Sequence, residues 1–174
     1  MKKLVILGPE STGKSTLCEN LASHFNTLWC PEYARKYLLT NGTEYSYDDL
    51  LIIAKGQVAL EEKYIALARS RQDALLFIDT DMHVMKVWCE FVYGKCHPWI
   101  EEELLKRQYH GYLLCQPDLP WVKDELREYP DQERRDQLYT LYRNMLEQQR
   151  APWATISGNY TARLATAISF AQRR

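Results

Sequence analysis

Long apolar runs, a strong net charge and paired cysteines are all missing from this sequence, and each absence excludes a class of protein. No apolar run approaches the ~20 residues of a membrane-spanning helix, so no membrane partner is expected. The formal net charge is −1, whereas a nucleic-acid-binding domain normally shows a basic excess, so no nucleic-acid partner is expected. The five cysteines are scattered and form no CxxC pair, which argues against disulfides and zinc and indicates the reducing cytoplasm.

A short stretch near the N-terminus carries the strongest signal. It reads Gly8-Pro9-Glu10-Ser11-Thr12-Gly13-Lys14-Ser15-Thr16 and matches the phosphate-loop pattern G-x-x-x-x-G-K-[ST]. The glycines let successive backbone N–H groups point into one concavity, which suits phosphate oxygens. We expect Lys14 to reach the β- and γ-phosphates of ATP and the Ser15 hydroxyl to hold Mg²⁺. The predicted ATP-binding residues are Gly8, Glu10, Ser11, Thr12, Gly13, Lys14, Ser15 and Thr16.

The residues on either side supply the setting that this motif requires. Residues 4–7 (Leu-Val-Ile-Leu) fit a strand buried on both faces, and residues 14–25 place Leu17, Leu21 and Phe25 at helical spacing. Strand, loop and helix in this order favour a phosphate-binding loop over a glycine turn that binds nothing.

The rest of the chain alternates apolar runs with amphipathic stretches. Further strands are expected at residues 28–30, 74–79, 112–115 and 153–157, and helices at 48–71, 82–91, 131–149 and 161–172. The pattern predicts one α/β domain over residues 1–174, with a five-stranded, mainly parallel sheet flanked by helices in three layers. A charged lid is expected after the fourth strand, at about residues 121–136.

Three carboxylates follow predicted parallel strands, at the edge where ligands bind in open α/β sheets. Asp79 ends an apolar run and is predicted to help hold Mg²⁺ with Ser15. Asp81 reaches the substrate or caps the next helix, and Glu32 meets the phosphoryl acceptor or favours a helix start. Either Glu32 or Asp81 is the candidate base, and Arg35 is expected to face the same cleft.

The stretch after the fourth strand contains an aromatic residue and several arginines. Trp121 either stacks on a flat substrate ring or packs in the core. Phosphoryl transfer needs cations around the migrating group, which makes Arg127 the first candidate and Arg134 and Arg135 weaker ones. The alternative for this charged run is a solvated face.

Other aromatic residues are assigned to packing. Trp88 and Phe91 are expected to face the core from the helix at 82–91. Tyr45 either lines a pocket or, as the favoured interpretation, packs on the surface. The turn around Asn159 is expected to border the adenine of ATP.

Five stretches occur in the order of a known family: residues 8–15, Pro31-Glu32-Tyr33-Ala34-Arg35, Ile78-Asp79-Thr80-Asp81, Pro117-Asp118-Leu119-Pro120-Trp121 and Ser157-Gly158-Asn159-Tyr160. Together they resemble the ribosylnicotinamide kinase domain of the NadR family over essentially the whole chain. The resemblance implies a P-loop kinase fold. It also implies substrate contacts from Glu32, Tyr33, Arg35, Asp118 and Trp121.

The resemblance further implies transfer of the ATP γ-phosphate to the 5′-hydroxyl of nicotinamide riboside, which gives nicotinamide mononucleotide in NAD salvage. Neither the adenylyltransferase nor the DNA-binding activity of full-length family members is expected of residues 1–174. Two alternatives remain: a P-loop kinase of another nucleoside, nucleotide or small metabolite, and a nucleotide-hydrolysing switch or interaction module. A GTPase is disfavoured because no Asn-Lys-x-Asp stretch occurs.

Overall fold

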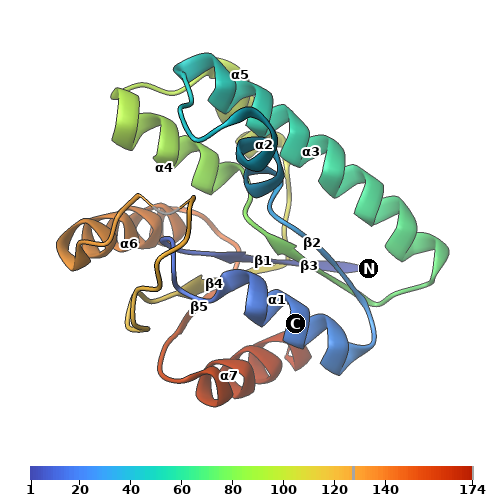
Figure 1. Ribbon diagram of the computed structural model, residues 1–174. Helices are drawn as coiled ribbons and strands as arrows, with labels where there is room; N and C mark the ends of the chain where they lie inside the picture. Colours follow the sequence, from blue (N-terminus) through green and yellow to red (C-terminus); the bar gives the residue numbers. More distant parts are fainter. Residues whose placement is uncertain (127, 174) are drawn as a thin grey trace.

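Five parallel strands form the centre of the molecule, in the order β2-β3-β1-β4-β5 (Figure 1). The computed structural model describes residues 1–126 and 128–173. Its strands are β1 (Lys2–Leu7), β2 (Leu28–Cys30), β3 (Leu75–Asp79), β4 (Gly111–Cys115) and β5 (Trp153–Ile156). All four neighbouring pairs are parallel, so the predicted sheet is confirmed and is parallel throughout.

Helices cover both faces of this sheet and make the molecule three-layered. One face carries α1 (Lys14–Phe25) and α7 (Tyr160–Gln172). The other carries α3 (Tyr47–Ser70), α4 (Met82–Tyr93) and α6 (Gln132–Gln148). The shorter helices α2 (Tyr33–Asn41) and α5 (Pro98–Lys106) pack against α3 and α4 on that second side (Figure 1).

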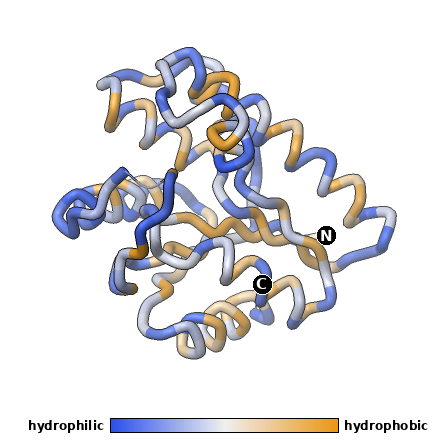
Figure 2. Tube along the Cα trace, in the orientation of Figure 1, coloured by the Kyte–Doolittle hydropathy of each residue, from blue (hydrophilic) through white to orange (hydrophobic). Residues whose placement is uncertain are grey.

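The central strand shows why the chain folds this way. Leu4 and Ile6 of β1 face α1 and α7, whereas Val5 and Leu7 face the opposite layer, and all four are fully buried. A parallel strand with both faces covered reads as an unbroken apolar run, which is the pattern at residues 4–7. Figure 2 shows the same hydrophobic colouring along the strands of the sheet.

Local signals set the helix boundaries. The Ser46 side chain accepts from the Asp49 amide while the Asp49 carboxylate accepts from the Ser46 amide, which forms a capping box at the start of α3. Within residues 1–126 and 128–173, no helix is both long and apolar enough to span a membrane.

Candidate active site

The phosphate loop lies at the carboxyl edge of the sheet, between β1 and α1. Gly8 has φ 141°, and a Cβ there would lie 2.5 Å from the Cys115 carbonyl oxygen at the end of β4. Gly13 has φ 74° and directly precedes the first residue of α1. Both glycines are therefore required by the backbone, and the free N–H groups of the α1 N-terminus open toward the loop.

Two side chains of the loop bond to its own backbone. The Lys14 Nζ donates to the Pro9 carbonyl oxygen at 2.9 Å, and the Thr12 hydroxyl donates to the same oxygen at 2.7 Å. The Lys14 ammonium is thus bonded to a neutral backbone carbonyl of the loop itself. A phosphate oxygen carries more charge than this carbonyl and would be the stronger partner.

The predicted metal ligands are adjacent. The Ser15 hydroxyl donates to Asp79 Oδ2 at 2.5 Å, which brings together the start of α1 and the end of β3. Burial and then the Glu32 carboxylate raise the pKa of Asp79 to about 6, against the opposing effects of Lys14 and Ser15. A hydroxyl and a carboxylate are hard oxygen donors, and Mg²⁺ at such sites takes its other ligands from phosphate and water. The two residues therefore fit Mg²⁺.

Glu32 follows β2 and precedes α2, and its carboxylate makes no capping bond to the helix. It lines the same cavity as Lys14 and Ser15 and accepts from the Thr80 hydroxyl at 3.3 Å. The buried Gln57 of α3 accepts from the Tyr33 amide at 2.7 Å and donates to the Asp79 carbonyl at 3.4 Å. Gln57 thereby ties the residue after Glu32 to the end of β3.

Asp81 has a different environment. It is fully buried, accepts from the His83 amide at 3.0 Å as the N-cap of α4, and contacts His83 Nδ1 at 2.7 Å. Both carboxylate oxygens are thus engaged within α4. The sequence left two interpretations of Asp81, a substrate contact or a helix cap, and its contacts are those of a helix cap.

A cavity of about 240 Å³ extends from the phosphate loop toward α2 and α4. Besides the loop, Glu32 and Arg35, its walls carry the aromatic residues Trp88, Phe91, Tyr129 and Tyr142. Trp88 and Phe91 pack against the buried core, as expected, and both also line this cavity. Helical periodicity identified the inward side of α4 but not the gap between that side and the loop.

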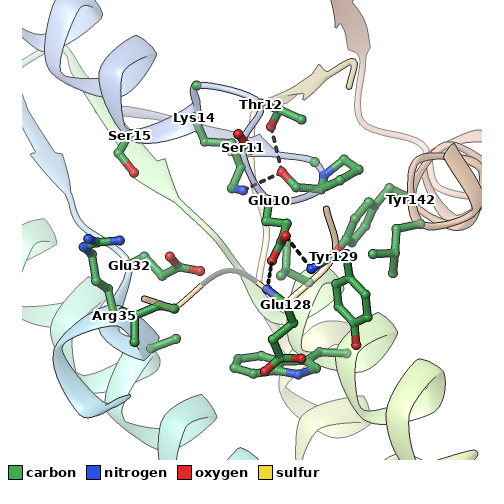
Figure 3. A pocket seen from close by; sticks show the side chains of 18 of the residues that line it. Glu10, Ser11, Thr12, Lys14, Ser15, Glu32, Arg35, Glu128, Tyr129 and Tyr142 are labelled. Atoms are coloured by element: carbon green, nitrogen blue, oxygen red, sulfur yellow. Dashed lines mark hydrogen bonds between the residues drawn. The ribbon is translucent and has the colours of Figure 1, made fainter. Parts of the chain in front are cut away.

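A second carboxylate, Glu128, lines the far side of the cavity (Figure 3). Glu128 Oε2 accepts from the Tyr45 hydroxyl at 3.0 Å, and that hydroxyl accepts from Trp88 Nε1 at 2.9 Å. Tyr45 therefore bonds to two residues that line the cavity, although it is not itself among the lining residues. Partial burial raises the pKa of Glu128 above its usual range, Tyr45 and Tyr129 lower it, and Glu10 raises it.

The residues predicted to contact the substrate divide into two groups. Glu32 and Arg35 line the cavity, and Arg35 Nη2 forms an ion pair with Asp124 Oδ2 at 2.9 Å. Tyr33 does not line this cavity but borders a second hollow beside α2, which Glu32 and Arg35 also line. Trp121 donates from Nε1 to Glu10 Oε1 at 3.2 Å and is not among the residues that line the cavity.

Asp118 and Asn159 have structural contacts. Asp118 forms an ion pair with the buried Arg163 and accepts from the Gly158 amide at 2.6 Å. Asn159 caps α7 by accepting from the Ala162 amide at 2.9 Å. Arg163 was not predicted from the sequence, although it donates to the Thr12 carbonyl at 3.0 Å and so supports the phosphate loop.

The arginines after β4 are only partly described. Arg127 lies outside the described residues, so its predicted role stays a prediction. Arg134 lies over the ring of Tyr129, and Arg135 is 3% exposed. Among the described residues, Arg135 Nε and Nη1 have no hydrogen-bond partner.

The fold and the loop define a class of protein: a phosphate-loop nucleotide-binding domain on a parallel α/β sheet. The sequence profile of the family described as AAA domain matches residues 3–163, and the chain belongs to this family.

The chain is also similar to NadR proteins. It is 33% identical over 152 residues to the trifunctional NAD biosynthesis/regulator protein NadR of Escherichia coli strain K12, an alignment covering 85% of this chain and 36% of that protein. A crystal structure of NadR protein in complex with NR matches 99% of this chain and 49% of its own, with a TM-score of 0.82 at 21% identity. A second, of NadR in complex with NAD and AMP-PNP, gives a TM-score of 0.71. The resemblance predicted from the motifs is confirmed, and the chain spans about a third of the length of the curated relative.

Proposed function

We propose that this domain transfers the γ-phosphate of ATP to the 5′-hydroxyl of nicotinamide riboside, which gives nicotinamide mononucleotide and ADP in NAD salvage. The cavity carries the proposal, because it joins a phosphate loop to aromatic walls and to two carboxylates from outside the loop, Glu32 and Glu128. Aromatic faces and carboxylates suit a flat cationic ring such as pyridinium. The similarity to NadR proteins supports the same acceptor. Action in the cytoplasm, where thiols stay reduced, is part of the proposal and agrees with the free cysteines described.

The residues of the loop would bind the nucleotide. Lys14 and the backbone N–H groups would neutralise the β- and γ-phosphates, and Ser15 and Asp79 would hold Mg²⁺. When bound, this metal stabilises negative charge on the phosphate oxygens. The proposed role of Arg127 is to add a cation at the migrating group.

Glu32 is the better placed of the two candidate bases. It lines the cavity beside Lys14, whereas both oxygens of Asp81 are engaged by His83. In the transfer, the acceptor oxygen bonds to the γ-phosphorus, the bond to the β–γ bridging oxygen breaks, and the hydroxyl proton passes to Glu32. Positioning and electrostatics supply most of the rate.

The direct test is an ADP-release assay with ATP, Mg²⁺ and a panel of acceptors that includes nicotinamide riboside, with products identified by mass spectrometry. We expect nicotinamide mononucleotide to form only when the riboside is present. Turnover with another acceptor alone would overturn the substrate while retaining a kinase. ATP hydrolysis that no acceptor stimulates would instead favour the switch or interaction module.

Replacing Glu32 and Asp81 in turn by the corresponding amide tests which of them is the base. We expect Glu32→Gln to lower kcat by about 10²- to 10³-fold, in the range of general-base contributions. Asp81→Asn should act mainly on stability, because it weakens the cap of α4. The measurement is kcat per folded enzyme, together with the thermal midpoint. An unchanged kcat for Glu32→Gln would contradict the assignment.

The Glu128 carboxylate is expected to attract the positively charged ring of the acceptor. Glu128→Gln keeps the acceptor oxygen for Tyr45 but removes the charge, and we expect the KM for nicotinamide riboside to rise about tenfold, or about 1.4 kcal/mol. The KM for ATP should stay within about twofold, since the loop is untouched.

The same residue predicts a pH dependence. Only the deprotonated carboxylate attracts a cation, and burial raises the pKa of Glu128, so the charge is lost as pH falls through a range above that of an ordinary glutamate. The KM for the riboside should therefore rise as pH falls in wild-type protein and change less in Glu128→Gln. Equal pH profiles for the two proteins would exclude this role.

A further inference from the structure

The phosphate-binding role of the loop does not explain why residue 10 carries a carboxylate. Glu10 stands within the loop, beside the place where several negative phosphate oxygens are to be bound. A carboxylate there repels phosphate, and the repulsion grows when water is excluded. Its backbone N–H suits the loop, but its side chain does not serve as a phosphate ligand.

The contacts of Glu10 explain why a carboxylate is kept. Glu10 Oε1 accepts from the Tyr129 amide at 2.7 Å and from Trp121 Nε1 at 3.2 Å, and Oε2 accepts from the Glu128 amide at 2.9 Å. Figure 3 shows the Glu10 side chain extending from the loop toward Glu128 and Tyr129, away from Lys14. The two carboxylate oxygens together offer enough lone pairs for all three donors, whereas the single oxygen of an amide does not.

The neighbouring loop residue adds a fourth link. The Ser11 hydroxyl accepts from the Val122 amide at 3.1 Å. Glu10 and Ser11 thus fasten the connection between β4 and α6 to the loop at more than one point, across 111 or more residues of sequence.

The residues held by Glu10 form one wall of the cavity, at the end where the acceptor is proposed to bind. Glu128 and Tyr129 both line it, and Glu128 is held on its other side by Tyr45. We propose that Glu10 is a positioning residue for the acceptor: it fixes the backbone of Glu128 and Tyr129, so that the acceptor wall keeps its place relative to the phosphate loop. The inference rests on the proposed kinase function only for the identity of the acceptor.

Glu10→Gln tests this with a small change of shape. The amide keeps one acceptor oxygen, but its NH₂ group faces an N–H group where the second oxygen stood. We expect the KM for nicotinamide riboside to rise about tenfold while the KM for ATP stays within about twofold, as for a loss of about 1.4 kcal/mol at the acceptor wall alone. Ser11→Ala, which removes one hydrogen bond, should shift the same constant in the same direction by less.

A rise in the KM for ATP with an unchanged acceptor KM would overturn the proposal, since Glu10 would then act on the nucleotide. The proposal would also be overturned if the KM values for ATP and for nicotinamide riboside rose equally, or if neither KM changed. Hydrogen–deuterium exchange of the free protein supplies a readout that needs no substrate. We expect the amides of Glu128 and Tyr129 to exchange at least tenfold faster in Glu10→Gln, and unchanged exchange would refute the link. If wild-type protein did not phosphorylate the riboside, the proposed function would fail, and the exchange result would still decide the role of Glu10.

Discussion

Replacing Lys14 by alanine should lower kcat/KM by about 10³-fold or more, which corresponds to about 4 kcal/mol of lost transition-state stabilisation. Lys14 is the one side-chain cation of the phosphate loop, and it is held above the loop by the Pro9 carbonyl oxygen at 2.9 Å. Phosphoryl transfer is catalysed mainly by fixed charge around the phosphate oxygens, so removing this ammonium removes a large share of the effect.

The fold should tolerate the change. Within the protein, Lys14 contributes one hydrogen bond to a neutral carbonyl, which is worth about 1 kcal/mol. Steady-state rates are therefore to be compared at equal folded fraction, as judged by circular dichroism and the thermal midpoint. Lys63→Ala, at an exposed position of α3, removes the same charge far from the loop and should leave the rate unchanged. Near-normal turnover by Lys14→Ala would contradict the assignment of the loop.

The features that the sequence predicted well depend on neighbouring residues. The phosphate loop is a continuous motif, and β1 and β3 are apolar runs whose ends place Ser15 and Asp79 at one edge of the sheet. In a parallel sheet all strand ends on one edge meet, so the adjacency of these two residues follows once the strands are known.

The features that could not be predicted from the sequence depend on contacts between residues that are distant along the chain. The bond between Tyr45 and Glu128 spans 83 residues, and neither residue belongs to a recognisable motif. The periodicity of α4 marks Trp88 as inward, but the cavity beside it is also lined by Glu128 and Tyr129 of the connection after β4, which are distant in sequence. Glu10 was assigned to nucleotide binding from its place in the loop, while its side-chain partners are more than 100 residues away.

Arg163 is the clearest example of such a residue, and we expect its replacement to lower the stability of the protein strongly. It is a single arginine in α7, 2% exposed. Its Nε donates to the Gly158 carbonyl at 2.7 Å, and Nη1 donates to Thr12 at 3.0 Å. Nη2 donates to the Gln116 carbonyl at 2.9 Å and pairs with Asp118. One guanidinium thus joins the loops that follow β1, β4 and β5.

Arg163→Met keeps much of the side-chain volume but leaves these carbonyls and the Asp118 carboxylate without their donor. Breaking a buried ion pair by removing one partner costs about 3–5 kcal/mol, and we expect a fall of about 10 °C or more in the thermal midpoint. The matched control is Arg143→Met, which removes an exposed pair with Glu147 and should change stability by less than about 0.5 kcal/mol.

The same substitution should affect nucleotide binding in the protein that remains folded. The Thr12 carbonyl loses its anchor to the end of β4, so the phosphate loop is held less firmly and the KM for ATP should rise. Urea unfolding and ATP titration below the lowered midpoint measure the two effects separately. A thermal midpoint within about 2 °C of wild type would show that water replaces the guanidinium at these carbonyls, and that the three strand ends hold the loop without Arg163.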